Sequence, residues 1–354
     1  MPQIALSRRD LVALVSLGAS STAISASSAA VVSRGYSQRE IDAAVQASYE
    51  RYRGLTDGAN FNHPALINVP TGYFGVSLMT ADGLATNAGQ TQQSFSIQSI
   101  SKVITLALVL EESGEQTILD SIGVDATGRV FNSIEAIEVH HGRMLNPMVN
   151  PGAIATAGRV LGGSVDEAWA KILAFHGRFS GRELTIDEAM YRSAMASNQR
   201  NRAMALLMSS YDQFPGDPDR ALDLYTRQCS ISVTARDLSV VAGTLANGGR
   251  NPVTGVQVVN SRHIPSILAV MATAGLYDTS GQWLFRTGLP AKSGVAGGMI
   301  AVAPGKFGIG TFAPPLDAAG NSVRGQRAIL DISDVLGGNP YAFLPSRICL
   351  RGSR

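Results

Sequence analysis

Apolar residues recur with two different spacings along this chain, one typical of helices and the other of strands. Between residues 38 and 53 the spacing is helical, and Ser37 and Glu40 form the capping box that begins such a helix. The segment 75–79 is strand-like, and the Ala-Asp-Gly turn at 81–83 predicts that it folds back as a hairpin. The amino-terminal part of the chain therefore supplies one helix and one pair of strands.

The far end of the chain repeats the strand signal. Apolar segments at 298–302 and 307–312 flank a Pro-Gly-Lys turn, which predicts a second hairpin. Six segments between the hairpins carry helical periodicity: 100–112, 151–161, 165–176, 186–192, 200–210 and 235–246. Strands from both ends with helices between them predict an α/β (α+β) fold. We expect one antiparallel sheet built from N- and C-terminal strands, flanked by helices, with an inserted mainly helical lobe.

The length of 354 residues is enough for one large domain with a substantial core. We expect a folded domain over residues 37–345, with no internal repeat and no low-complexity linker. Its sheet lobe is predicted at 37–112 and 255–345, and its helical lobe at 113–254.

Composition excludes several classes of function. The net charge of +2 is too small for a nucleic-acid-binding surface. Two cysteines, Cys229 and Cys349, cannot form a disulfide framework, and no spacing of Cys and His completes a metal site. The glycine-rich GVAGGM segment lacks the context of a nucleotide loop. We therefore expect a small-molecule substrate, with neither a metal nor a cofactor.

The first thirty residues differ from the rest of the chain. Arg8 and Arg9 precede an apolar run and then small residues, which is the order of a secretory signal peptide. Within SRRDL the pair resembles a twin-arginine signal. Residues 1–30 are therefore predicted to be cleaved near Ala29 or Ala30, although a basic leader or an uncleaved anchor shares the pattern. The product would be periplasmic or secreted, without stable membrane insertion, because no later apolar run reaches about 18 residues.

Lysine is rare in this sequence, and two of its positions indicate chemistry. Only four of the 29 basic residues are lysines. Arginine stays protonated in proteins, whereas a buried lysine can lose its proton. Lys171 is predicted on a helix surface and Lys306 in a turn, where drift explains them. Lys102 and Lys292 lie in apolar surroundings, so a deprotonatable amine explains them better.

Two short motifs contain these lysines. Ser99 stands three residues before Lys102 in FSIQSISKV, so both side chains lie on one face at the start of a predicted helix. A neutral amine there can accept the hydroxyl proton as the serine attacks a carbonyl carbon. Lys292-Ser293-Gly294 precedes a predicted strand, as does the partner motif of serine β-lactamases and penicillin-binding proteins. Together the motifs predict a serine acyl-transfer enzyme.

Eight longer segments carry a more specific resemblance. In chain order they read QSISK, NPMVNPGAIAT, RNRAMALL, LDLYTRQCSISVTARDL, LANGGRNPVTG, GLYDTSGQW, GLPAKSGVAGG and PPLDAAGNSVRG. Their order and spacing resemble the serine-dependent glutaminases from about residue 38 to about residue 334. The resemblance implies a β-lactamase/transpeptidase-like fold and hydrolysis of L-glutamine to L-glutamate and ammonia. It also implies a homo-oligomer, either a dimer or a tetramer.

The resemblance further implies which residues perform the chemistry. Ser99 matches the nucleophile and Lys102 the amine that activates it. Tyr277 matches a second proton-transfer group, and Lys292 supports the site. In this scheme Ser99 Oγ attacks a carboxamide carbon, and water then hydrolyses the acyl-enzyme while the same groups reverse their roles.

The same resemblance implies a substrate-binding set: Ser99, Asn150, Asn201, Tyr225, Tyr277 and Val295. Val295 would act through its backbone N–H, which together with that of Ser99 forms an oxyanion hole. The residues alone leave other roles open. Asn150 could be a turn residue, Asn201 a helix cap, and the two tyrosines core aromatics.

Three positions depart from the family pattern. Ala194 stands where the family has a glutamate that pairs with the α-ammonium of glutamine, and Asn62 where it has a tyrosine that frames the pocket. Pro151 replaces an alanine and is a milder change. Burying an unpaired ammonium costs several kcal/mol.

The departures leave three hypotheses, of which the first keeps a working glutaminase. A neighbour such as Asn198, or a carboxylate elsewhere in the chain, could replace the missing glutamate. The substrate could instead be a carboxamide that lacks a free α-amine. The chain could also be a catalytically silent binding protein on the same scaffold. A β-lactamase or penicillin-interactive enzyme is a further alternative, but Tyr225 stands where its S-x-N motif would be expected.

Overall fold

The structure is a computed structural model that describes residues 35–342 except 127, 143–145, 213 and 215. The predicted signal peptide, the end of the domain at residue 345 and Cys349 lie outside the described residues. The described residues from Tyr36 to Ala342 form a single compact unit. Within the described part, no helix combines the length and the apolar character needed to cross a membrane.

A five-stranded sheet joins the two ends of this unit, as the sequence predicts. Its strands lie in the order β2-β1-β7-β6-β5, and every neighbouring pair is antiparallel. The strands are β1 (Gly75–Thr80), β2 (Ala85–Gly89), β5 (Ala291–Ser293), β6 (Gly298–Ala303) and β7 (Phe307–Phe312). A separate pair consists of β3 (Phe95–Ser96) and β4 (Ser232–Val233). The early hairpin therefore pairs with the late one through β1 and β7.

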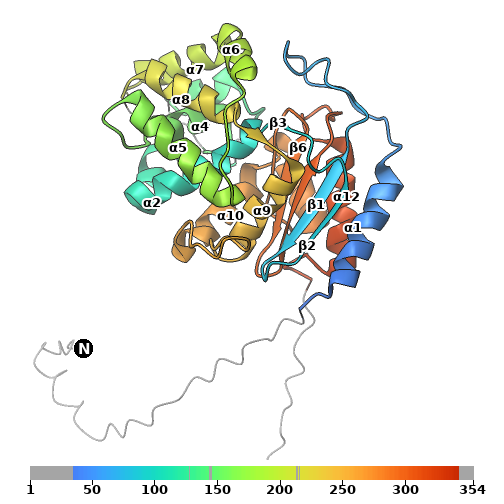
Figure 1. The fold of residues 1–354 in the computed structure, drawn as a ribbon. Coiled ribbons are helices and arrows are strands. Elements are labelled where there is room, and N and C mark those ends of the chain that lie inside the picture. Colours follow the sequence, from blue (N-terminus) through green and yellow to red (C-terminus); the bar gives the residue numbers. More distant parts are fainter. Residues whose placement is uncertain (1–34, 127, 143–145, 213, 215, 343–354) are drawn as a thin grey trace, which may run out of the picture. The chain divides into compact units, whose positions relative to one another are not determined.

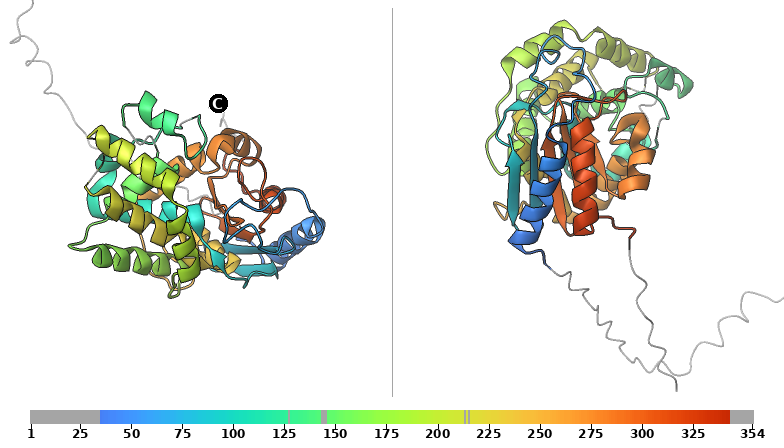
Figure 2. Two further views of the ribbon diagram at one scale, coloured as in Figure 1. Left: turned by 90° about the horizontal axis from the view of Figure 1, so that it is seen from above. Right: turned by 90° about the vertical axis from the view of Figure 1, so that its right-hand side faces the viewer.

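Helices cover both faces of the sheet, so every residue of β1, β6 and β7 is buried. On one face α1 (Gln38–Tyr52) and α12 (Val323–Leu336) lie side by side (Figures 1 and 2). On the other face α9 (Ala235–Ala246) lies along β7, β1 and β6. Side chains along β6 alternate between the two faces of the sheet. Met299, Ala301 and Ala303 belong to the core cluster on the face that α1 and α12 cover.

Two glycines of β7 set how closely α9 approaches the sheet. A Cβ atom on Gly308 would lie 2.2 Å from the backbone of Ala242, and one on Gly310 would lie 2.3 Å from the backbone of Ser239. No real side chain fits at such a distance, so both positions require glycine. The sequence assigned α9 to the helical lobe. In the structure α9 packs against the sheet and also joins the helical core through Leu238 and neighbours.

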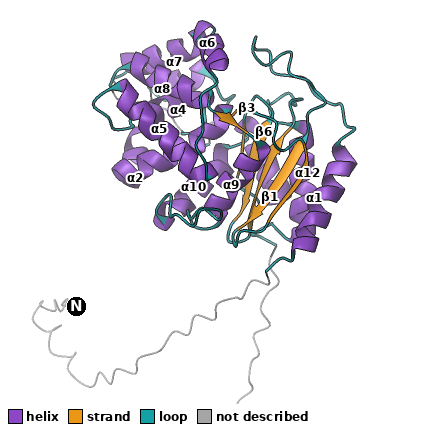
Figure 3. Cartoon of the chain, viewed as in Figure 1, coloured by secondary structure: helices purple, strands orange, loops and turns teal. Residues whose placement is uncertain are grey.

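The remaining helices form the mainly helical region, which Figure 3 shows beside the strands. They are α2 (Ser101–Ser121), α3 (Ile134–Val139), α4 (Asn150–Gly158), α5 (Val165–Ser180), α6 (Glu188–Ala196), α7 (Gln199–Ser210), α8 (Pro218–Cys229) and α10 (Ile264–Ala274). The exception is α11 (Ser280–Thr287), which contacts α12 and whose Trp283 joins the core cluster of the sheet. Single 3₁₀ turns are η1 (Gln98–Ile100), η2 (Ser261–His263) and η3 (Tyr277–Thr279). The first ten residues of α2 are all buried, and this helix runs through the core of the region.

The structure differs from the predicted elements in length and number. α2 extends to Ser121, past the predicted end at 112, through a break at Gly114 where φ is 77°. Helices α3, α8, α10, α11 and α12 and the short strands β3, β4 and β5 were not predicted. A strand of two or three residues is too short for a period of two to be recognised.

Candidate active site

Ser99 lies in the turn η1, between β3 and the start of α2. Gln98 has a φ of 49°, a left-handed conformation that costs a non-glycine residue on the order of 1–3 kcal/mol. Ser101 Oγ donates to the carbonyl oxygen of Gln98 at 2.7 Å and so holds the turn. Ser99 therefore directly precedes the amino-terminal end of α2, where the helix dipole favours a developing negative charge.

Lys102 is the second residue of α2, and only 1% of it is exposed. Burial lowers the pKa of its amine to about 7, although Cys229 opposes the shift. Its Nζ donates to Asn150 Oδ1 at 2.7 Å and to the carbonyl oxygen of Met148 at 3.3 Å. A neutral amine carries two N–H groups and one lone pair. These two acceptors therefore satisfy the neutral form and leave the lone pair able to take a proton.

The hydroxyl of Ser99 interacts with two tyrosines, Tyr225 and Tyr277. The three-residue spacing predicted a direct contact with Lys102. The described residues show no hydrogen bond between these two side chains. The connection runs instead through Tyr225, whose hydroxyl donates to the same Asn150 Oδ1 at 3.1 Å. Burial raises the pKa of Tyr225 well above its usual value, so this phenol stays protonated.

Tyr277 begins the turn η3 and also has a left-handed backbone, with a φ of 59°. Its ring is buried and lies 4.6 Å from that of Phe131, centroid to centroid. Burial raises the pKa of Tyr277 to about 12, and hydrogen bonds with Ser99 and Ser293 lower that pKa by less than burial raises it. The phenol is therefore protonated at neutral pH. Because its hydroxyl meets that of Ser99, it can hold or move a proton there.

Lys292 lies on β5 behind Tyr277, and its Nζ is 4.3 Å from the centroid of the tyrosine ring. The amine donates to the carbonyl oxygens of Gly275 at 2.9 Å and Ser293 at 2.8 Å. Burial, and then the charge of Lys102, lower the pKa of Lys292 well below its usual range. Lys292 thus ties Tyr277 and the end of β5 together without presenting a fixed charge.

The turn after β5 contributes Val295 to the wall beside Ser99. Within the turn, the backbone N–H of Gly294 donates to the carbonyl oxygen of Gly298. The N–H of Gly297 donates to the carbonyl oxygen of Gly294, and both distances are 2.9 Å. A Cβ atom on Gly294 would lie 2.8 Å from the carbonyl oxygen of Ile97. Glycine is therefore what allows the Lys-Ser-Gly segment to approach the serine turn.

A chain of side-chain amides connects Lys102 to the predicted substrate-binding residues. Asn150 Nδ2 donates to Asn201 Oδ1 at 3.0 Å, and Asn201 Nδ2 donates to Asn198 Oδ1 at 2.7 Å. Asn198 Nδ2 then donates to Thr226 Oγ1 at 2.9 Å. The alternative roles do not hold. Asn150 begins α4, and Asn201 lies inside α7, whose N-cap residue is Asn198.

These side chains line a cavity of about 210 Å³. It is lined by Phe61, His63, Leu66, Gln98, Ser99, Phe131, Asn132, Asn150, Met190, Ala194, Ser197, Asn198, Arg200, Asn201, Tyr225, Thr226, Cys229 and Val295. The structure thus brings five predicted residues to one cavity, namely Ser99, Asn150, Asn201, Tyr225 and Val295, whereas Tyr277, Lys102 and Lys292 are buried and do not line it.

Several lining residues were missed by the sequence analysis. Phe131 and Asn132 come from the loop before α3, and Arg200 Nε donates to the carbonyl oxygen of Asn132 at 3.0 Å. Cys229 is a free, buried thiol whose pKa burial raises, as expected for a structural cysteine. Arg200 and Cys229 lie in segments that carry the family resemblance, whereas only spatial proximity identifies Phe131 and Asn132.

The three departures from the family pattern are placed differently. Ala194 lines the cavity on α6. Asn62 is exposed between the lining residues Phe61 and His63. Pro151 lies in the first turn of α4, where the missing N–H costs little.

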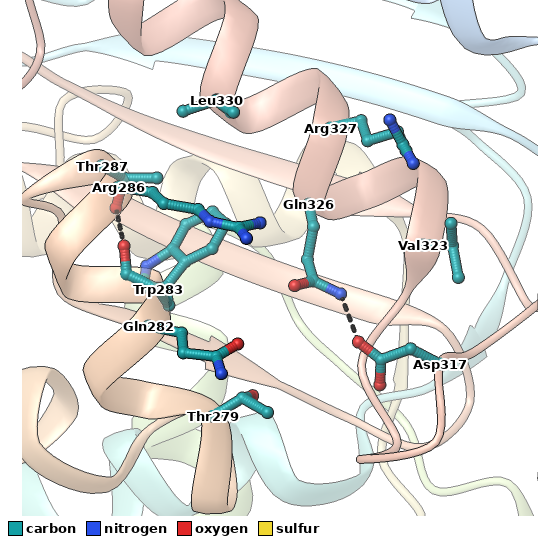
Figure 4. Close-up of a pocket in the computed structure, with 10 residues that line it drawn as sticks. All are labelled: Thr279, Gln282, Trp283, Arg286, Thr287, Asp317, Val323, Gln326, Arg327 and Leu330. Atoms are coloured by element: carbon teal, nitrogen blue, oxygen red, sulfur yellow. Dashed lines mark hydrogen bonds between the residues drawn. The ribbon is translucent and has the colours of Figure 1, made fainter.

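A second cavity lies on the other side of the segment that holds Tyr277. Figure 4 shows its walls, formed by α11, α12 and the loop at Asp317. Asp317 accepts from Gln326 Nε2 at 2.8 Å in this view. In the same loop, Asn321 Oδ1 accepts from Ser293 Oγ at 2.5 Å, and its Nδ2 donates to Thr279 Oγ1 at 3.0 Å. The loop thus braces the end of β5, which the sequence analysis did not foresee.

An α/β fold with a serine at a helix start, a neutral buried lysine and a protonated tyrosine defines a class of protein suited to serine-dependent acyl transfer. The glutaminase family model matches residues 59–341. The glutaminase of Colwellia psychrerythraea is 47% identical over 305 residues, which cover 86% of this chain and 98% of that protein. Glutaminase 2 of Yersinia pestis is 46% identical over 302 residues, covering 85% and 89%.

A solved structure described as the probable glutaminase ybaS has the same fold. It superposes with a TM-score of 0.86 at 41% identity, covering 87% of this chain and all of that one. The chain belongs to the glutaminase family.

Proposed function

We propose that this protein hydrolyses the side-chain carboxamide of L-glutamine to L-glutamate and ammonia through an acyl-enzyme on Ser99. The observation that carries the proposal is the buried Lys102, whose amine has a pKa of about 7 and lies next to the serine turn. The names of the relatives support glutamine as the substrate.

The first step is attack of Ser99 Oγ on the carboxamide carbon. The hydroxyl proton is taken by the lone pair of Lys102, whose amine has to come within hydrogen-bond distance of Ser99 Oγ in the substrate complex, and the carbonyl oxygen becomes an oxyanion. The backbone N–H groups of Ser99 and Val295 stabilise this oxyanion, each contributing about 3 kcal/mol. The C–N bond then breaks, and the leaving nitrogen takes a proton from the Lys102 and Tyr277 side and departs as ammonia.

The second step returns the enzyme to its starting state. Water attacks the acyl carbon and gives a proton to the same groups, the bond to Ser99 Oγ breaks as that proton passes to the oxygen, and glutamate leaves. Asn150, Asn201 and Tyr225 orient the substrate from the amide chain. Tyr225 and Lys102 both donate to Asn150 Oδ1, which fixes the two side chains relative to each other.

Ammonia release with and without the nucleophile tests the proposal. Wild-type protein should release ammonia from L-glutamine, and Ser99→Ala should reduce the rate to that of buffer. Intact-mass analysis of acid-quenched wild-type reactions should find a glutamyl adduct that the variant lacks. A Ser99→Ala protein that retains full activity would contradict the proposed chemistry.

We also propose that residues 1–30 export the protein to the periplasm or the medium. The proposal is supported by Arg8 and Arg9, the apolar run and the small residues that follow. Replacing both arginines with lysine should leave the protein in the cytoplasmic fraction. Export at the wild-type level in that variant would argue against a twin-arginine signal.

Homo-oligomerisation is a third proposal, supported by the family resemblance alone. Analytical ultracentrifugation of the mature protein should give the mass of a dimer or tetramer. A monomer at micromolar concentration would contradict it.

A further inference from the structure

We infer that the active-site cavity prefers a glutamine whose α-nitrogen is uncharged, such as an N-acylated glutamine, over free glutamine. The inference rests on the proposed function, because it concerns the same cavity and the same reaction at Ser99. Its basis is the charge and the polarity of the walls around that serine.

The cavity offers no carboxylate to an ammonium group. None of the described residues that line it is an aspartate or a glutamate. Residues 127, 143–145, 213 and 215, which the structure does not describe, include neither residue type in the sequence. Wherever the α-ammonium of free glutamine lies in this cavity, it therefore loses water without gaining an ionic partner.

Asp317 is the carboxylate whose charge raises the pKa of Tyr277, and it already accepts several hydrogen bonds. Asp317 raises the pKa of Tyr277 but lines the other cavity. It accepts from the backbone N–H groups of Ala319 and Asn321, both at 3.0 Å, and from Gln326 at 2.8 Å. Its charge is thus directed into its own loop and away from the substrate.

The side-chain oxygens of the three linked asparagines each already accept a hydrogen bond. Asn198 Oδ1 accepts from Asn201, Asn201 Oδ1 accepts from Asn150, and Asn150 Oδ1 accepts from Lys102. Asn198, the residue that could have replaced a missing carboxylate, therefore has both ends of its amide committed to the chain of amides.

The charges that do line the cavity favour an anion. Arg200 is exposed, and its Nε is fixed to Asn132, which leaves other N–H groups free to meet a carboxylate. His63 Nδ1 accepts from the backbone N–H of Ala65, so Nε2 carries the proton and meets Ser197 Oγ at 3.1 Å. Free glutamine is a zwitterion of zero net charge, whereas N-acylglutamine is a monoanion. A cavity with one guanidinium and no carboxylate suits the monoanion better.

An apolar wall adjoins this polar part. Ala194 packs in a cluster with Leu66, Met190, Phe61 and Val295. All five line the cavity beside Ser99. An acyl chain on the α-nitrogen would bury apolar area against this wall, at about 25 cal/mol per Å². The same surface offers nothing to a hydrated ammonium.

Ammonia release from two substrates tests the inference. For the wild-type protein, kcat/KM for N-acetyl-L-glutamine should exceed that for L-glutamine by about tenfold, the discrimination that one poorly compensated ion produces. Ala194→Glu places a carboxylate on the wall and should reverse the preference. The matched control is Ala196→Glu, which adds the same charge on an exposed position of the same helix outside the cavity. It should leave the ratio unchanged.

A second measurement needs no variant. Lengthening the acyl group from acetyl to butyryl adds two methylenes and should raise kcat/KM about fifteenfold, because each one buried is worth about 0.8 kcal/mol. This series decides the matter if the Ala194→Glu protein does not fold.

The possible outcomes separate the two proposals. A wild-type preference for free glutamine, or a ratio that Ala194→Glu leaves unchanged, overturns the inference and leaves the proposed function standing. A flat or falling acyl series also overturns it. Absence of ammonia from every substrate in folded protein overturns the proposed function, and the inference with it.

Discussion

The amine of Lys102 should control the pH dependence of the reaction. An ordinary lysine has a pKa of 10.5, and burial in α2 lowers that of Lys102 to about 7. At pH 7 about half of the amine is then neutral, compared with roughly three molecules in ten thousand for the ordinary value. Burial therefore increases the population of active base by roughly 10³-fold.

The sign of the effect follows from which form reacts. Only the neutral amine can accept the serine proton, so kcat/KM should rise about tenfold per pH unit below pH 7 and level off above it. Tyr277, with a pKa of about 12, should stay protonated throughout this range. Ammonia release between pH 5 and pH 9 measures the profile, with L-glutamine and N-acetyl-L-glutamine as substrates.

Lys102→Arg provides the matching perturbation. Arginine keeps the positive charge and the length of the side chain but cannot lose its proton, so kcat/KM should fall by about 10³-fold or more. Lys171→Arg is the control. Lys171 lies on α5, is half-exposed, and forms an ion pair with Glu112 at 2.8 Å outside the active-site cavity. A flat profile from pH 5 to 9, or a Lys102→Arg protein with more than a tenth of wild-type activity, would refute this reasoning.

Three further changes test other parts of the site and fold. Tyr277→Phe should lower kcat by about 10²-fold or more with only a small change in melting temperature, since it removes the hydroxyl that interacts with Ser99 together with its long hydrogen bond to the carbonyl oxygen of Ser293 at 3.4 Å; ammonia release and a thermal melt measure the two effects. Gly294→Ala should reduce kcat about tenfold or more because its Cβ meets backbone at 2.8 Å, whereas Gly281→Ala, in open space, should not. Arg182→Ala should lower the free energy of unfolding by about 1–2 kcal/mol with kcat retained, because it removes two hydrogen bonds to a buried carboxylate, and urea denaturation measures this loss.

Local patterns predicted the elements whose signals lie within one segment. The capping box at Ser37 and Glu40 forms as expected and begins α1 at Gln38. Both hairpins are confirmed, and in each a strand-like apolar segment is bounded by turn residues. The signal for α8 was also present, since Asp217 caps the helix and Pro218 follows at its first position. It was overlooked because the segment was interpreted only as a motif.

The candidate site was less accessible to such patterns. The pair Ser99 and Lys102 could be predicted from spacing, but the partners of Lys102 could not. Asn150, Asn201 and Tyr225 come from α4, α7 and α8, and only the packing of these helices brings them together. Nor does any local rule predict that the lysine donates to Asn150.

The structure also separates the residues that react from those that select. Ser99 and Lys102 belong to a helix that is buried over its first ten residues, so changes there disturb the core. Ala194 belongs to α6, in which Met190 is the buried residue. A substitution at position 194 therefore alters the substrate wall at little cost in stability. Because the two functions lie on different elements, the catalytic arrangement can persist while the wall is changed, and this is the combination that the sequence presents.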